Sequence, residues 1–137
     1  MTDHKEYSDF DFVAAFRQCT LLPGQFCHEA HLRLAWLYLG EFGLDITLVR
    51  LQDDLKKYVD YWGASDKYNT TLTIASIRAV HHFILKSKSH TFLEFIAEFP
   101  RLKYQFKEVL GCHYTTDIFN SETAKHVFLE PELLPFD

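Results

Sequence analysis

The stretch that decides the fold is Phe26-Cys27-His28-Glu29-Ala30-His31-Leu32-Arg33-Leu34-Ala35-Trp36-Leu37-Tyr38. It follows the turn pair Pro23-Gly24, and only Gly40 interrupts it before Gly43, where a helix C-terminus is expected. The pattern predicts one helix of about four turns over residues 27–42. Spacings of three and four place both histidines on the apolar face of that helix, with Glu29, Arg33 and Glu41 elsewhere. The other members of the apolar face are Leu32, Ala35, Leu39 and Phe42.

Two histidines on an apolar face raise two alternatives. At positions i and i+3 their rings can converge on one metal ion, as paired ligands do in helical metal sites. Alternatively, each ring is a core group that is hydrogen-bonded to a carboxylate or a carbonyl. His28-Glu29-Ala30-His31 does not match the zinc-protease signature, which needs histidines at i and i+4, and it lacks the Glu-x-x-His repeat of di-iron bundles.

Composition bounds the class of protein. The chain has 137 residues, of which 47% are hydrophobic and 16% aromatic, so one domain over residues 1–137 with a substantial core is expected. Its formal charge is −5 and no segment concentrates lysine or arginine, so we expect no nucleic-acid partner. The N-terminus lacks an apolar signal core, no run suits a membrane span, and the three cysteines form no C-x-x-C pair. These observations predict a cytoplasmic protein with reduced thiols and no membrane association.

The rest of the chain predicts further helices. They are expected over about 9–19, 45–62, 70–86, 92–99, 102–110 and 122–128, with breaks at Gly63, Pro100 and Gly111. The apolar residues after Phe128 predict an irregular tail that lies along the bundle. The expected fold is an all-α, single-domain, compact helical bundle of about five to six helices with an irregular C-terminal segment.

Three motifs resemble those of an uncharacterised family of small bacterial all-helical proteins. Residues 26–36 are similar to its F-x-H-x-x-H-L-R-x-A-W motif, residues 67–73 to K-Y-H-E-T-I-T, and residues 128–131 to an F-V-L-P-D-like end. The resemblance implies a histidine and a glutamate in the second motif, which with the helix pair would suit a divalent metal. This chain carries Asn69 and Thr70 at those two positions, so other histidines complete the site or the site is lost.

The first functional hypothesis is a metal-dependent enzyme acting on a small molecule. His28, His31 and His81 are the candidate ligands for a divalent metal (Fe, Zn or Mn), with a carboxylate as the alternative third ligand. His81 is favoured because it keeps step with Ile77 and Ile84. His113 and His126 are possible replacements that we expect at the surface. The candidate catalytic residues are Tyr38, Tyr68 and Thr71, and the candidate ligand-binding residues are Trp36, Tyr68, Asn69 and Arg78.

Two further hypotheses need no metal. One is a non-catalytic helical module that binds a small apolar ligand or a protein partner in an aromatic-lined pocket. In that case Asn69 and Thr70 only cap the following helix. The other is an acid–base enzyme that uses a His28/Glu29 or a His31/Tyr68 pair, although Glu29 lies about 100° round the helix from His28.

Overall fold

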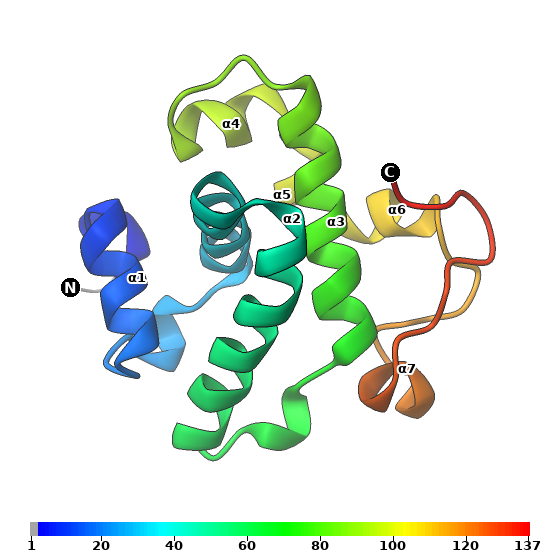
Figure 1. Ribbon diagram of the computed structural model, residues 1–137, viewed down its shortest axis with the longest axis horizontal. Helices are drawn as coiled ribbons and strands as arrows, with labels where there is room; N and C mark the ends of the chain where they lie inside the picture. Colours follow the sequence, from blue (N-terminus) through cyan, green and yellow to red (C-terminus); the bar gives the residue numbers. More distant parts are fainter. Residues whose placement is uncertain (1–2) are drawn as a thin grey trace.

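Helix α2 is the centre of the fold, because α1, α3, α4 and α5 all pack against it. The computed structural model describes residues 3–137, and within that range the regular structure is entirely helical (Figure 1). The predicted all-α fold is confirmed. The α-helices are α1 (Asp9–Arg17), α2 (His28–Tyr61), α3 (Thr70–Lys86), α4 (Phe92–Glu98), α5 (Arg101–Tyr104), α6 (Phe106–Gly111) and α7 (Glu122–His126), and the 3-10 turns are η1 (His4–Glu6), η2 (Pro23–Gln25) and η3 (Ser65–Lys67).

The helix count differs from the predicted five to six, since residues 3–137 form seven α-helices. The predicted helix over 102–110 is divided into α5 and α6 at Gln105, which has φ −134° and ψ 38°. Side chains cap the N-termini of three of the shorter helices. Ser8 and Ser121 each accept a backbone N–H at the start of α1 and α7, and Thr91 forms a capping box with Glu94 in α4.

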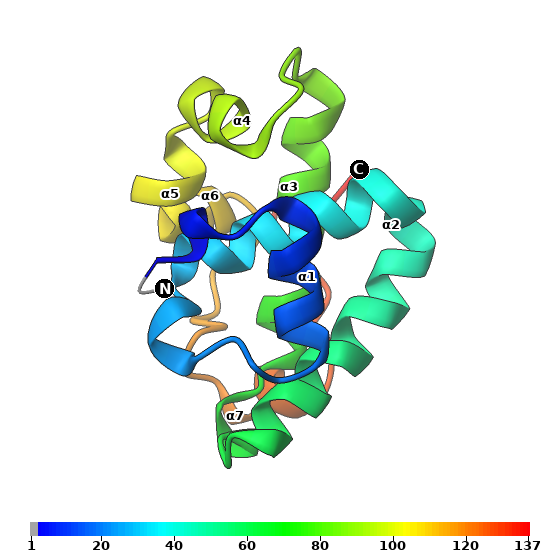
Figure 2. The ribbon, with the colours of Figure 1, turned by 90° about the vertical axis from the view of Figure 1, so that its left-hand side faces the viewer.

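Gly43 divides α2 into two arms, which Figure 2 shows on either side of a bend. Its backbone has φ 75° and ψ 178°, a combination that essentially only glycine adopts. The helices predicted over 27–42 and 45–62 are therefore both present, and the non-helical backbone of Gly43 separates them as the two arms of α2. Across the bend, the Tyr38 hydroxyl donates to Asp54 Oδ2 (2.6 Å) and accepts from Arg17 Nε (3.1 Å). These bonds join α1 to both arms and hold the angle between them.

Helix α3 lies between two apolar clusters. Ile77 and Val80 belong to the main core, to which α1, α2 and α4 also contribute. Ala75 and Ala79 belong to a second cluster, formed with residues of α6 and α7. The face of α3 that carries Ile77 and Val80 can therefore form the wall of a cleft opposite the two arms of α2.

The segment after α7 is irregular and lies along the bundle, as the sequence predicts. Thr71 Oγ1 donates to the Val127 carbonyl (2.8 Å) and accepts from the Leu129 N–H (3.0 Å). His113 Nδ1 is hydrogen-bonded to the Leu134 carbonyl (2.7 Å). In Figure 1 this segment runs beside α6, and Phe136 packs into the second apolar cluster.

Candidate functional site

The candidate site is a cleft of about 630 Å³ between the two arms of α2 and the first half of α3. We call it the α2–α3 cleft. Turn η3 and the segment around Phe26 also contribute to its lining. Its walls are mostly apolar, and they include Leu32, Ala35, Leu55, Val59, Leu72 and Ile77. The bend at Gly43 creates this space, because a straight α2 would carry its second arm away from α3.

His28 and His31 both line the α2–α3 cleft, but neither turns into the core. His28 Nε2 donates to the Leu102 carbonyl (2.9 Å), and its ring packs on Phe106 with 4.8 Å between centroids. His31 stacks on Phe26 with 3.7 Å between centroids and an interplanar angle of 6°. The prediction of two buried rings directed at one centre is therefore wrong.

The histidines are accessible, contrary to the prediction, because the first arm of α2 is covered on more than one side and buries other residues. Glu29 and Arg33, predicted to lie off the apolar face, are only 7% and 6% exposed, whereas His28 and His31 are solvent-accessible. The N-terminal segment supplies partners for both charged residues, so that their burial is compensated. Helical periodicity predicts which apolar residues of a helix are buried. It does not predict the burial of polar residues whose partners are distant in the sequence.

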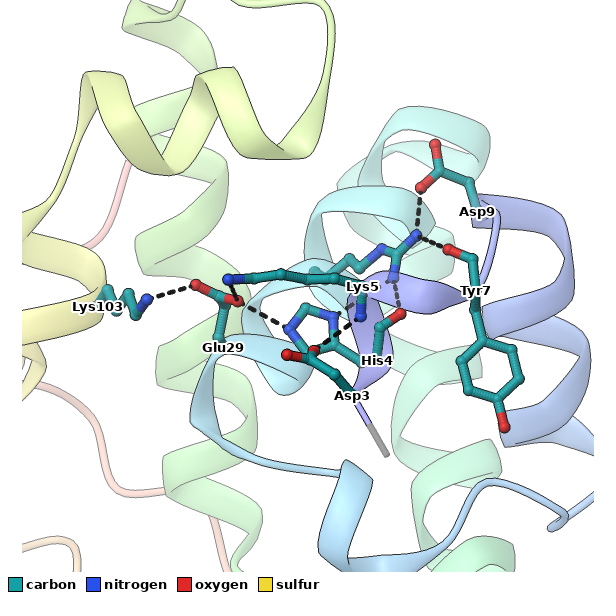
Figure 3. A network of polar contacts seen from close by, with 8 residues as sticks. Asp3, His4, Lys5, Tyr7, Asp9, Glu29 and Lys103 are labelled. Atoms are coloured by element: carbon teal, nitrogen blue, oxygen red, sulfur yellow. Dashed lines mark hydrogen bonds and ion pairs between the residues drawn. The ribbon is translucent and has the colours of Figure 1, made fainter. Parts of the chain in front are cut away.

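Figure 3 shows those partners, which form a group that we call the Glu29 cluster. Glu29 Oε1 accepts from His4 Nε2 (2.8 Å), and its Oε2 lies 2.8 Å from Lys103 Nζ. Arg33 donates to the carbonyls of His4 (2.6 Å) and Tyr7 (2.9 Å), and it pairs with Asp9 (2.9 Å). Since Glu29 is engaged by His4 and Lys103, the predicted His28/Glu29 acid–base pair does not form.

His31 is neutral at physiological pH. Its pKa is lowered from 6.5 to about 4, first because enclosure by protein disfavours the charged ring and second because His28 is close. A hydrogen bond with the Phe26 backbone opposes this shift in pKa. The side chain is solvent-accessible where it lines the cleft, so its neutral imidazole is open to a small molecule.

The histidines do not form the predicted metal site. Within residues 3–137, no group of three or more His, Cys, Asp or Glu side chains is arranged to hold a metal ion. His81 is half-buried on α3 and is not part of the cleft lining. The set His28, His31 and His81 therefore does not fit a divalent Fe, Zn or Mn ion, and we derive no step from one.

Residues of the second motif, 67–73, have structural roles at the α2–α3 cleft. Asn69 Oδ1 accepts from the Leu72 N–H (2.9 Å), and its Nδ2 donates to the Ile118 carbonyl (2.7 Å), so this side chain caps α3. Tyr68 donates from its hydroxyl to Gln52 Oε1 (2.9 Å), and burial raises its pKa. Both residues line the α2–α3 cleft, and no hydrogen bond between Tyr68 and His31 is present in the described part of the chain.

The remaining predicted residues lie elsewhere. Tyr38 is buried at the bend, where burial and the Asp54 carboxylate raise its pKa despite the Arg17 cation, and Thr71 holds the C-terminal segment. Arg78 donates to the Asp137 carbonyl (3.4 Å). Trp36 lines a second cavity of about 700 Å³, the α1–α2 groove, between α1, the first arm of α2 and the end of α3. Of the predicted catalytic and ligand-binding residues, the structure brings only Tyr68 and Asn69 to the cleft with the two histidines.

Two residues of the cleft are not singled out by sequence reasoning. Trp62 follows the last turn of α2, and Lys67 ends η3; both line the cleft. In the sequence, Trp62 is only the last residue of the helix predicted over 45–62, and Lys67 is only the first residue of the second motif. A lysine within a short loop that joins two amphipathic helices was the available signal.

Comparison with known proteins adds no relative. No protein family, characterised protein or solved structure matches the chain. The resemblance to the bacterial helical family, carried by residues 26–36 and 67–73, stays a prediction. No helix within residues 3–137 is both long and apolar enough to cross a membrane.

Proposed function

We propose that this protein binds a small, largely apolar molecule in the α2–α3 cleft. The cleft itself carries the proposal: its volume of about 630 Å³ lies within the range of small-molecule sites, and most of its lining side chains are apolar. A concave site of this size suits a compact ligand better than a protein surface.

The polar groups of the cleft support binding rather than catalysis. Thr73 Oγ1 donates to the Asn69 carbonyl (2.8 Å), and Ser76 Oγ donates to the Leu72 carbonyl (2.6 Å). These hydroxyls are thus bonded to their own helix, and neither is bonded to a base. His31 remains as a neutral imidazole that can exchange a hydrogen bond with a ligand.

The α1–α2 groove is larger, at about 700 Å³, but its lining is less suitable for an apolar ligand. Asp9, Arg17 and Glu41 bring charges of both signs to it, together with Gln18 and two serines. An apolar molecule in this groove would desolvate charged groups without pairing them. We therefore place the ligand in the α2–α3 cleft.

A cytoplasmic location is part of the proposal. It is supported by the three cysteines, Cys19, Cys27 and Cys112, which are all free thiols. Free thiols are typical of a reducing compartment.

Fluorescence of the neutral apolar probe N-phenyl-1-naphthylamine tests the proposal. Enhanced emission is expected with the wild-type protein, with saturation in the micromolar range. Ser76→Phe places a ring in the α2–α3 cleft, whereas Gln18→Phe places the same ring in the α1–α2 groove. We expect the first variant to lose the probe and the second to retain it. No binding to a folded wild-type protein, or loss only in Gln18→Phe, would overturn the proposal.

A further inference from the structure

We propose that the ligand of the α2–α3 cleft carries a single negative charge at one end, as an aliphatic carboxylate does. The inference rests on the proposed function and specifies the ligand's chemistry. It depends on how charge and hydrogen-bond donors are distributed along the cleft.

The lining of the α2–α3 cleft carries one cationic side chain. Lys67 is the one Lys, Arg, Asp or Glu residue among the described side chains that line it. The absence of a carboxylate from this lining contrasts with the composition of the chain, which has 19 acidic and 14 basic residues. It also contrasts with the α1–α2 groove, which is lined by two carboxylates, Asp9 and Glu41. The α2–α3 cleft therefore lacks the charge that would repel an anion.

The Lys67 ammonium is available to a ligand. Within residues 3–137, its Nζ takes part in no ion pair, side-chain hydrogen bond or aromatic contact. Other lysines are engaged: Lys103 and Lys5 pair with Glu29, and Lys56 lies over the Tyr68 ring at 5.2 Å. A carboxylate entering the cleft would not have to displace a partner from Lys67.

A second donor belongs to Trp62, which also lines the cleft. Trp62 Nε1 is buried and has no hydrogen-bond acceptor in the described part of the chain. A buried donor without an acceptor destabilises the folded state, and a small shift of the indole toward a ligand oxygen would relieve that cost. Trp62 follows α2 and Lys67 ends η3, so the short connection between α2 and α3 supplies both of these cleft-lining residues.

His31 contributes no competing charge, because its imidazole is neutral at pH 7. It lies on the first arm of α2 and stacks on Phe26, which also lines the cleft. The cleft therefore combines a mostly apolar lining with one cationic side chain and no carboxylate. An amphiphile with one anionic head would match this lining.

Competition for N-phenyl-1-naphthylamine tests the inference with three eight-carbon ligands that carry different head groups: octanoate, octan-1-ol and octylamine. For the wild-type protein, octanoate should displace the probe at a concentration about three- to tenfold lower than either of the others. Its advantage should shrink as salt is raised, because the ion pair at the rim of the cleft is screened.

Two lysine variants separate Lys67 from the effect of net charge. Lys67→Gln should weaken octanoate about three- to tenfold and leave octan-1-ol unchanged, whereas Lys88→Gln, which removes an equal charge outside the cleft, should change neither. Equal displacement by octanoate and octan-1-ol, or equal effects of the two variants, would overturn the inference while the proposed function stands. Failure of the probe itself to bind would overturn the proposed function.

Discussion

The Glu29 cluster gives the sharpest prediction about stability. Burial alone raises the pKa of Glu29, but hydrogen bonds from Lys103 and His4 and the charges of Lys103 and Lys5 outweigh burial and lower the pKa from 4.5 to about 2. At about 1.4 kcal/mol for each pKa unit, this difference corresponds to about 3 kcal/mol of folding free energy at neutral pH. The Glu29 side chain is only 8% exposed, but those of Lys103 and Lys5 are 30% and 45% exposed, so water screens part of the contribution of the two lysines.

The sign of the pH dependence follows from the lowered pKa. The stabilising contribution is complete above pH 4.5, where the carboxylate of the unfolded chain is also ionised, and it is lost as the pH falls toward about 2. By pH 3, about two-thirds of it should be gone, because the unfolded chain has taken up the proton and the folded chain has not.

Urea unfolding of Glu29→Gln, followed by far-UV circular dichroism, measures this contribution. We expect a loss of about 2–3 kcal/mol at pH 7 and about 1 kcal/mol at pH 3, relative to the wild-type protein at the same pH. Glu41→Gln is the matched control, since Glu41 is exposed on the same arm of α2 and should change stability by less than about 0.5 kcal/mol. A loss below about 0.5 kcal/mol at pH 7, or an equal loss at both pH values, would refute the reasoning.

Three further predictions concern the bend, the C-terminal segment and the cleft. Gly43→Ala should cost about 1–3 kcal/mol in urea unfolding, since its φ of 75° suits glycine. Gly40→Ala should instead stabilise the helix by about 0.5–1 kcal/mol, because a Cβ there meets no atom within 4 Å. Equal effects of the two substitutions would contradict the account of the bend. Thr71→Val should accelerate amide hydrogen exchange at Leu129 and cost about 1–3 kcal/mol of folding free energy. Thr71→Ser keeps the hydroxyl and should keep the Leu129 amide protected. Unchanged exchange in the valine variant would argue that Thr71 does not anchor the C-terminal segment. An NMR titration should place the midpoint of His31 near pH 4. The stability due to its neutral ring should therefore be complete above pH 6.5 and fall as the pH drops toward 4. A titration midpoint near 6.5 would show that the ring is not enclosed.

Local signals in the sequence predicted most of the helices. The caps at Ser8, Thr91 and Ser121 and the interruption at Gly43 depend on residues within one turn of the feature, so a reading of neighbours is sufficient. The division of residues 101–111 into two helices was missed, since no Gly or Pro marks the break at Gln105.

The candidate site was predicted only in part, because its geometry depends on contacts between distant segments. His28 bonds to a carbonyl 74 residues away, and Glu29 bonds to a histidine 25 residues away, so neither side chain follows the apolar periodicity of its helix. The sequence located the histidine pair and the residues at 68 and 69, but the cleft that unites them depends on the angle at Gly43 and on the packing of α3.

The most direct test of the account is an NMR measurement of which methyl groups lie next to bound N-phenyl-1-naphthylamine. Intermolecular NOEs from the probe to the methyl groups of Leu72 and Ile77, which line the α2–α3 cleft, are expected. NOEs to Val13 and Ile84, which line the α1–α2 groove, with none to Leu72 or Ile77, would contradict the claim that the bent α2 and α3 form the binding site.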